Sequence, residues 1–408
     1  MENELLTPEY IFYDGQKLIR NKDINKLLFE VNLKNKLKIS YYSLSFLLQN
    51  GIVPLPFTIY ENLYILGFGY THGLSEENKK INFKFNFPFK IGGNSTFNKE
   101  YYLNILTESI EKKLFKEKSF LLHSAGKDSN IIALCLSRLK DKYDITLINQ
   151  NYSGKLQSSE NEISKQISKK LGLKHITIDD NKTFNESEIK NFFQKMPLPC
   201  LDNLSLAYIK FDDRIQKESN IIDGMGNDIY LGHISSYREF FRQLFTPKLS
   251  FLKKKYSTRT LSRVNLLFKT RSENTGMIGF SYPDSLKMNP NIINTYNFWK
   301  NIDKKFPFND YNLFRSLVRG IHIDNEMYIR KSRNFCDIYN HNLVLPFYDT
   351  RCIEYLSNIK KKYLYNSITR QNKIIFRQVL KDELDLDYNI IKKKSFEYDY
   401  SKFLNENK

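Results

Sequence analysis

Residues 120–130, FLLHSAGKDSN, decide the fold of this chain. An apolar run ends in a turn that packs small residues, a lysine, an aspartate and two serines together, and a second apolar run, IIALCLSRL, follows. This pattern predicts a strand, a tight turn and a helix. Exposed backbone N–H groups and the partial positive charge of a helix N-terminus suit a phosphate chain. A plain strand–turn–helix corner is the alternative, and the turn is not a Walker A loop.

Strand and helix signals alternate between residues 118 and 223. Strands are expected at SFLLH (119–123), DITLIN (144–149), KHITI (174–178) and SNIID (219–223), and helices at 130–139 and 158–172. The second helix has Ile163, Ile167 and Leu171 one turn apart, with Gly172 as its stop. This order predicts an α/β fold with a parallel sheet. Because ligands bind beyond the carboxyl ends of such strands, the turn at 124–129 is a candidate site.

The regions on either side of this core have different patterns. Residues 1–90 alternate short apolar runs with turn signals, which indicates a short β-rich or mixed N-terminal region. The Gly92–Ser95 stretch is the best boundary, and a helix is expected at 98–116. From about residue 235 onward the pattern is mainly helical. We therefore predict two parts: an N-terminal region at 1–95 and a larger domain at 96–408 that contains the parallel sheet and the helical part.

Composition limits the class of protein and its partners. The net charge is +18, most visible in the basic segment 248–271, which indicates either an acidic partner or a solvated basic surface. No recognised nucleic-acid motif accompanies the charge, so nucleic acid is not expected as a partner. The four cysteines are widely spaced, which favours reduced thiols. No apolar run is long enough for a membrane helix and no signal peptide is present, so a cytoplasmic protein without membrane insertion is expected.

Four elements of the sequence resemble a known family. SAGKDS (124–129) resembles the S-G-G-x-D-S pyrophosphate loop of the ATP pyrophosphatases, the PP-loop or adenine nucleotide alpha-hydrolase-like proteins. Three more stretches resemble elements of asparagine synthetases and their β-lactam synthetase relatives: NGIVPLPFTIYENLYILGFGY (50–70), IIDGMGNDIYLGH (221–233) and LVLPFYDTRCIEYL (343–356). They occur in the family's order at sensible spacing. Residues 1–95 then resemble a remnant of a glutaminase-type domain with its connector, and residues 96–408 resemble the ATP-dependent synthetase domain of this family.

The resemblance implies the loop and the metal ligands. The pyrophosphate loop would consist of Ser124, Ala125, Gly126, Lys127, Asp128 and Ser129. Ala125 stands where the family usually has its first glycine. Asp128 and Asp228 match the two aspartates that hold Mg²⁺ on the phosphates of ATP, and carboxylates are the ligands that this hard cation prefers. Without the family pattern, Asp228 could equally cap a helix or pair with a lysine.

The resemblance also implies adenosine contacts and a catalytic lysine. Leu122, Ile148 and Gly224 fall where the family contacts adenosine. Lys393, in IIKKKSF, matches a C-terminal lysine that neutralises charge at the reacting centre, and Lys394 is an alternative register. Taken alone, the lysine triplet would be a solvated face.

The implied reaction is that of an AMP-forming amide ligase. A substrate carboxylate would be activated as acyl-AMP with release of pyrophosphate, and ammonia or an amine would then form the amide. Residue 2 is Glu where glutamine-dependent members have a nucleophilic Cys, so the donor is free ammonia, an amine, or ammonia from a separate glutaminase. The carboxylate would belong to a small molecule, a peptide or a sugar.

Two departures from the family pattern bear on the acceptor. Met225 and Ile229 stand where asparagine synthetases have acids, which argues against aspartate as the substrate. A new acceptor and a degenerate site both agree with this change. The alternatives to the ligase are a tRNA-modifying ATP pyrophosphatase and a non-catalytic nucleotide-binding homologue.

Overall fold

The computed structural model describes residues 8–32, 37–75, 80–87, 92–151, 158–179, 186–202, 205, 208–212, 214–249, 269–306 and 310–388. The chain forms two compact units, and each collects three segments of sequence. Unit 1 contains Met1–Phe89, Asp228–Tyr328 and Tyr365–Asn372, and unit 2 contains Lys90–Asn227, Ile329–Leu364 and Lys373–Lys408. The predicted division at residue 95 stays a prediction.

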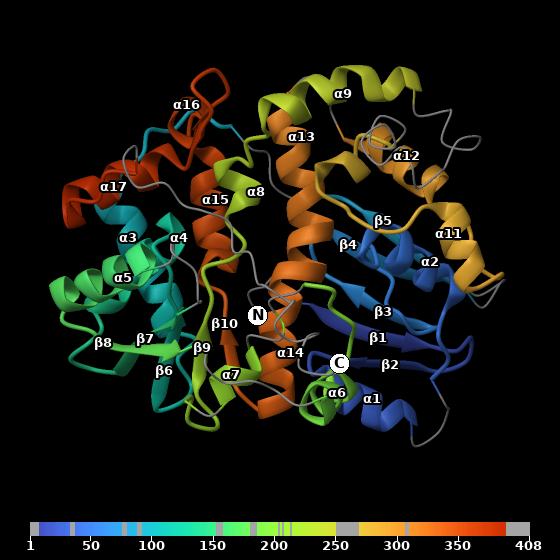
Figure 1. The fold of residues 1–408 in the computed structure, drawn as a ribbon, viewed down its shortest axis with the longest axis horizontal. Coiled ribbons are helices and arrows are strands. Elements are labelled where there is room, and N and C mark those ends of the chain that lie inside the picture. Colours follow the sequence, from blue (N-terminus) through green and yellow to red (C-terminus); the bar gives the residue numbers. More distant parts are fainter. Residues whose placement is uncertain are drawn as a thin grey trace. The chain divides into compact units, whose positions relative to one another are not determined.

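Unit 2 is built on a parallel sheet of five strands (Figure 1). The strand order is β10 (Asn342–Val344), β9 (Asn220–Ile222), β6 (Lys118–Leu122), β7 (Asp144–Asn151) and β8 (Lys174–Asp179). Every neighbouring pair is parallel. In the register of the sheet, Leu121 pairs with Leu147 on one side and with Ile222 on the other. β6 is the central strand of this sheet, and the turn at 124–126 follows its carboxyl end.

Helices cover both faces of this sheet because successive strand residues point to opposite sides. Phe120, Ile148 and Ile221 pack on one face with residues of α6 (Glu186–Lys195), α7 (Ile209–Asp212) and α14 (Arg330–Tyr339). The strands β6 to β8 also contact α4 (Lys127–Ser137) and α5 (Ser158–Leu171), and α4 contacts α3 (Lys99–Glu111) and α17 (Ile374–Leu384). Burial of each large apolar side chain contributes about 1.5–3 kcal/mol. The remaining elements of unit 2 are η6 (Pro346–Tyr348), α15 (Thr350–Asn358) and α16 (Lys361–Leu364).

The structure confirms the predicted fold class: a parallel α/β sheet with a helical C-terminal part, preceded by antiparallel strands. All four predicted strands and the three predicted helices near the sheet are present. One difference matters for the site. Helix α4 begins at Lys127, earlier than expected, because Gly126 is its N-cap residue. Lys127, Asp128 and Ser129 therefore form the first turn of a helix.

Unit 1 begins with antiparallel strands. The sheet order is β2 (Leu18–Asn21), β1 (Glu9–Tyr13) and β3 (Leu63–Leu66), and β4 (Tyr70–Ser75) pairs with β5 (Lys80–Phe85). Two helices, α1 (Ile24–Asn32) and α2 (Tyr41–Asn50), lie between β2 and β3 in the sequence. The short hairpin of β11 (Tyr365–Asn366) and β12 (Gln371–Asn372) also belongs to this unit.

The second segment of unit 1 is helical. Its elements are α8 (Asp228–Leu231), α9 (Tyr237–Leu249), η4 (Glu273–Thr275), α11 (Tyr282–Met288), α12 (Tyr296–Lys305), α13 (Tyr311–Val318) and η5 (Arg319–Ile329), an 11-residue π-helix. The buried Trp299 ring packs edge-on against Phe46, and its N–H donates to Asn50 at 2.9 Å. No helix within the described ranges is both long and apolar enough to cross a membrane.

Candidate active site

Two serines close the turn between β6 and α4. The backbone N–H of Ser124 donates to Ser129 Oγ at 3.2 Å, and the Ser129 hydroxyl lies 2.9 Å from the Ser124 carbonyl oxygen. The N–H of Gly126 donates to Ser124 Oγ at 3.1 Å. Among the described side chains, none caps the start of α4. The first N–H groups of this 11-residue helix therefore form a donor set suited to an anion.

Asp128 lies in the first turn of α4 and is held by two partners. Its Oδ1 accepts from Asn227 Nδ2 at 2.7 Å, and its Oδ2 lies 2.5 Å from Lys373 Nζ. The Lys373 side chain is only 6% exposed and that of Asp128 22%. Lys373 precedes α17 in the left-handed conformation, with φ of 55°. A buried ammonium group thus compensates the charge of this carboxylate and fixes its position.

Lys373 was missed by reasoning from the sequence. It lies 245 residues from Asp128 along the chain, and no motif that we identified includes it. The contact arises because α17 packs against α4. Only the tertiary packing of the two helices brings the two charges together.

The turn after β9 packs directly on the start of α4. A Cβ atom placed on Gly224 would lie 3.3 Å from the backbone nitrogen of Ser129 and 3.4 Å from Ile132 Cδ1. A larger residue would therefore push the turn away from the loop. Gly224, predicted to contact adenosine, lies beside the predicted phosphate loop.

Asp223, which was also missed, directly follows β9. It is buried, its Oδ1 accepts from the N–H of Met225 at 3.1 Å, and the hydroxyl of Ser332 donates to its Oδ2. Burial raises the pKa of its carboxyl, and the nearby charge of Asp128 raises it further. The available signal was an acidic residue directly after two isoleucines, at the carboxyl end of a strand, where sites occur in such sheets.

The structure brings most of the predicted residues of unit 2 together. Leu122 and Ile148 are direct neighbours across β6 and β7 and lie on the same face of the sheet. Lys393 lies outside the described residues. Asp228 begins α8 in unit 1, so its role beside Asp128 stays a prediction. Among the residues that the structure describes, no group of three or more His, Cys, Asp or Glu side chains is placed to hold a metal ion.

A buried hydrogen-bond network holds the backbone of the loop at 124–129 through the carbonyl oxygen of Ala125. The hydroxyl of Tyr388 donates to the carbonyl oxygen of Ala125 at 2.9 Å and accepts from Asn130 Nδ2 at 2.5 Å. His123 Nε2 lies 2.7 Å from Asn130 Oδ1, and its Nδ1 lies 2.6 Å from Ser164 Oγ. Because burial lowers the pKa of His123, the ring is neutral near pH 7, and since Asn130 Oδ1 can only accept, the ring proton is placed on Nε2. The shape of the loop depends on a residue near the far end of the chain.

We expect this histidine to make stability depend on pH. Burial lowers the pKa of His123 to about 4, from an ordinary value of 6.5. Below pH 6.5 the unfolded chain binds a proton that the folded chain rejects, so stability is lost as the pH falls from 6.5 towards 4. The loss at pH 5 is about 2 kcal/mol from this residue alone.

Urea unfolding at pH 7 and at pH 5 measures this effect. The difference in unfolding free energy between the two pH values should shrink by about 2 kcal/mol in His123→Gln. An unchanged difference would show that His123 is not the responsible group. The other buried histidines, His322 and His341, are present in both proteins and cancel.

Comparison with known proteins gives a distant similarity. The chain is 33% identical over 121 residues to the tRNA-specific 2-thiouridylase MnmA of Ehrlichia canis (strain Jake). The match covers 27% of this chain, and the chain spans only 31% of the length of that relative. No family model matches the chain. The similarity and the parallel sheet support the PP-loop ATP pyrophosphatase superfamily, whereas the asparagine-synthetase-like subfamily stays a prediction.

Proposed function

We propose that the protein is an ATP-dependent ligase that cleaves ATP between its α- and β-phosphates and forms an amide. The observation that best supports this proposal is the Ser124–Ser129 loop at the carboxyl end of β6. The hydroxyls of Ser124 and Ser129 close the loop, and Asp128 is held in the first turn of α4. A substrate carboxylate oxygen attacks the α-phosphorus and pyrophosphate leaves. The nitrogen of ammonia or an amine then attacks the acyl carbon, AMP leaves and the nitrogen loses a proton.

The residues of unit 2 supply the binding surface in this proposal. The N–H groups at the start of α4 and the hydroxyls of Ser124 and Ser129 donate to phosphate oxygens. Leu122 would offer apolar contact to adenosine and Gly224 would leave room for it, whereas the neighbouring Ile148 is buried in the core beneath Leu122. Lys393 would neutralise charge at the reacting centre. Lys127, whose ammonium lies 5.3 Å from the centroid of the Tyr388 ring, stands at the same loop.

The donor chemistry fits Mg²⁺. Oδ2 of Asp128 contacts the ammonium of Lys373, so a bound Mg²⁺ would share this carboxylate with the lysine. Asp128 and Asp228 are the residues that would hold the ion, and carboxylate oxygens are its preferred protein ligands. When bound, Mg²⁺ would neutralise charge on the phosphates.

The acceptor is proposed to differ from aspartate. Ile229 is buried and packs closely on Gly320. A Cβ atom placed on Gly320 would lie 2.9 Å from the Cβ atom of Ile229. The position where asparagine synthetases have an acid is therefore part of the packed interior of unit 1. Met225 likewise offers neither charge nor a proton. We infer that the carboxylate belongs to another small molecule, a peptide or a sugar.

A tRNA-modifying ATP pyrophosphatase is the second candidate, favoured by the similarity to the tRNA-specific 2-thiouridylase. Transfer of sulfur through a protein thiol requires an accessible cysteine of low pKa. All four cysteines of this chain are buried. Burial raises the pKa of Cys135 to about 12 and also raises that of the other three. The burial of these thiols weighs against sulfur transfer through a cysteine of this chain.

An exchange assay separates these functions. The full chain with Mg²⁺-ATP and labelled pyrophosphate should form labelled ATP when a carboxylate pool contains the substrate, and hydroxylamine should trap the acyl group as a hydroxamate. Exchange that requires tRNA instead would select the second candidate. ATP binding by calorimetry with no exchange from carboxylates or tRNA would contradict both and favour a non-catalytic homologue.

A further inference from the structure

Over residues 237–243, helix α9 in unit 1 has Glu239 and Gln243 turned inward and its aromatic side chains turned outward. Tyr237, Phe240 and Phe241 occupy positions i, i+3 and i+4 and so share one face, and they are 60%, 37% and 57% exposed. Glu239 and Gln243, one turn apart, are buried: the Glu239 side chain is 11% exposed and Gln243 is 1% exposed. A surface helix normally buries its apolar side.

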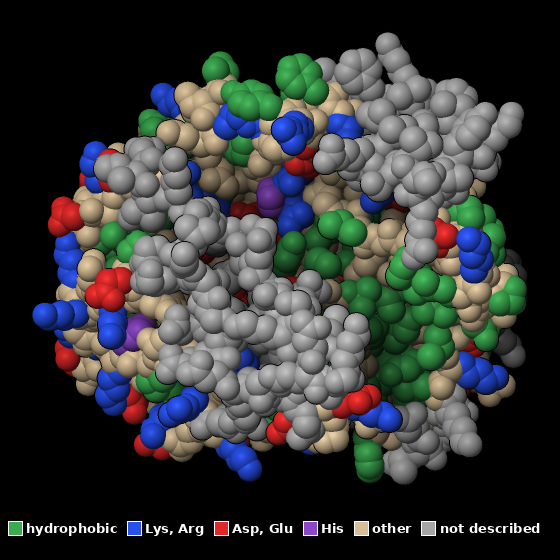
Figure 2. Space-filling model, in the orientation of Figure 1, with side chains coloured by type: hydrophobic (Ala, Val, Ile, Leu, Met, Phe, Trp, Pro, Cys, Tyr) green, Lys and Arg blue, Asp and Glu red, His purple; other side chains and the backbone are tan. Residues whose placement is uncertain are grey.

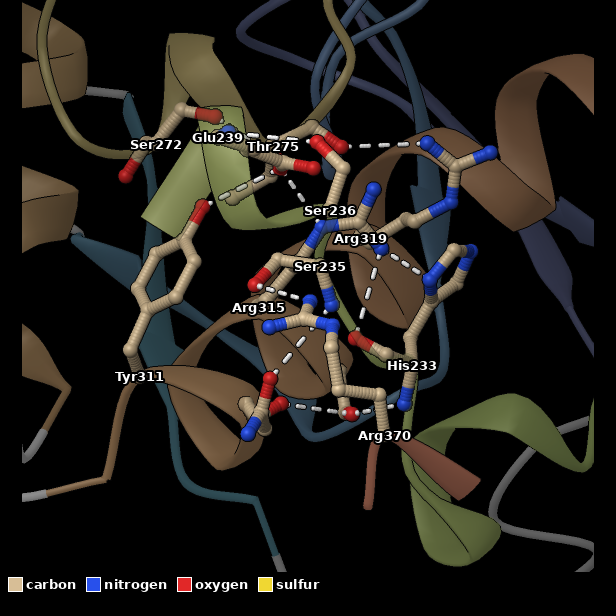
Figure 3. A network of polar contacts seen from close by, with 12 residues as sticks. His233, Ser235, Ser236, Glu239, Ser272, Thr275, Tyr311, Arg315, Arg319 and Arg370 are labelled. Carbon is tan, nitrogen blue, oxygen red and sulfur yellow. Dashed lines mark hydrogen bonds and ion pairs between the residues drawn. The ribbon is translucent and has the colours of Figure 1, made fainter. Parts of the chain in front are cut away.

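The buried side chain of Arg315 explains why Glu239 faces inward. Arg315 on α13 is 9% exposed at its side chain, and its Nε lies 2.6 Å from Glu239 Oε1. The Tyr311 hydroxyl donates to the same oxygen at 3.1 Å. Figure 3 shows His233, Arg315 and Glu239 converging in this network, in which Arg315 also bonds to the His233 ring. A buried guanidinium requires a carboxylate partner, so Glu239 must face inward and the aromatic residues are left outside.

The same pairing removes the negative charge of the helix from its surface. Glu239 is the one acid in the α9 sequence, YREFFRQLFTPKL. Arg238 remains exposed. From the neighbouring β11–β12 hairpin, the guanidinium of Arg370 lies 4.3 Å from the centroid of the Tyr237 ring and donates to Ser235 Oγ at 3.4 Å. Rings and guanidinium groups therefore share one face.

We call these residues the α9 surface: Tyr237, Arg238, Phe240, Phe241, Arg370 and the hairpin residue Ile368, which is 86% exposed. Along the upper edge of Figure 2, hydrophobic and basic side chains lie side by side over the start of α9 and the hairpin. Exposed apolar groups that gather in this way mark interaction sites.

We propose that the α9 surface binds single-stranded RNA, with bases stacked on its aromatic rings and phosphates bound by its arginines. Aromatic side chains and guanidinium planes are the groups on which unpaired bases stack. The net charge of +18 favours a polyanion. The proposal does not depend on the use of ATP.

The arrangement of charges distinguishes RNA from a membrane surface. A helix that lies in a lipid interface carries its cations on the face opposite its apolar residues. In α9 that opposite face is buried and contains Glu239 and Gln243. The cations instead stand beside and over the rings, as in sites that stack bases.

Fluorescence anisotropy with a labelled 12-nucleotide unstructured RNA tests the proposal on the full chain. The double variant Tyr237→Ala/Phe241→Ala should bind about 10-fold more weakly or worse, because each stacked base is lost. Arg370→Gln, which leaves the helix untouched, should lower the slope of log affinity against log salt by about 1. Phe115→Ala is the matched control, since Phe115 is 74% exposed but belongs to unit 2.

Three outcomes would overturn the proposal. One is that the wild-type chain does not bind the RNA. Another is that both the double variant and Arg370→Gln bind it as tightly, and with the same salt dependence, as wild type and Phe115→Ala. The third is that these variants lose binding to phosphatidylserine vesicles while RNA binding is unchanged, which would assign the surface to a membrane. Thermal unfolding of each variant confirms that the comparison is made between folded proteins.

Discussion

Replacing Asp128 with asparagine is expected to lower ATP–pyrophosphate exchange by about 10²–10³-fold, the usual cost of removing one preorganised electrostatic group. Asparagine keeps the size of the side chain and can still bond to Asn227, which now donates to Asp128 at 2.7 Å. It removes the charge that would hold Mg²⁺ and that now faces Lys373. The measurement is the initial rate of exchange with the substrate identified in the carboxylate screen.

Two further variants control this experiment. Asp141→Asn removes an exposed carboxylate just beyond α4 and should leave exchange unchanged. Because Asp128→Asn leaves the buried ammonium of Lys373 without its charge partner, the double variant with Lys373→Met tests whether lost folding explains the lost rate. Exchange near the wild-type rate in a folded Asp128→Asn protein would refute the assignment of this site.

Gly226→Ala is expected to lower the free energy of unfolding by about 2–4 kcal/mol, from backbone strain and overpacking together. Gly226 has a φ of +107°, which side chains other than glycine rarely adopt. A Cβ atom here would lie 2.4 Å from Cε1 of the buried Tyr348 ring. The glycine-containing turn at 224–228 and the LPFYD element at 345–349, which are separate in the sequence, therefore pack in close contact through Gly226 and Tyr348.

Gly73→Ala provides the matched control for this prediction. A Cβ atom on Gly73 would have no neighbour within 4 Å, so this variant should unfold at nearly the wild-type urea concentration. Replacing Tyr348 with leucine in the Gly226→Ala background should recover part of the loss. Equal unfolding midpoints for Gly226→Ala and wild type would mean that the turn does not pack against Tyr348.

Local patterns carried the prediction of the fold because each strand and helix near the site has its own signal. Apolar runs that end at polar turns predicted the positions of β6 to β9 in the sequence. The GKDS turn predicted the start of α4 to within a few residues. β10 (Asn342–Val344) was not predicted, because the sequence from about residue 235 onward was expected to be mainly helical.

The rest of the site required tertiary contacts. Lys373 and Tyr388 reach the loop only through the packing of α17 on α4, and no periodicity encodes that. The orientation of α9 is a similar case. Hydrophobic periodicity alone would bury Tyr237 and Phe241, whereas the buried charge of Arg315 takes priority and turns Glu239 inward.

The tether between Tyr388 and the carbonyl of Ala125 also sets an order of events during synthesis. The two residues are 263 positions apart. At a translation rate of about 5–20 residues per second, the ribosome makes Tyr388 about 13–50 s after the loop. Lys373 arrives only slightly earlier. A nascent chain therefore carries the loop without these two contacts until Lys373 and Tyr388 have been made.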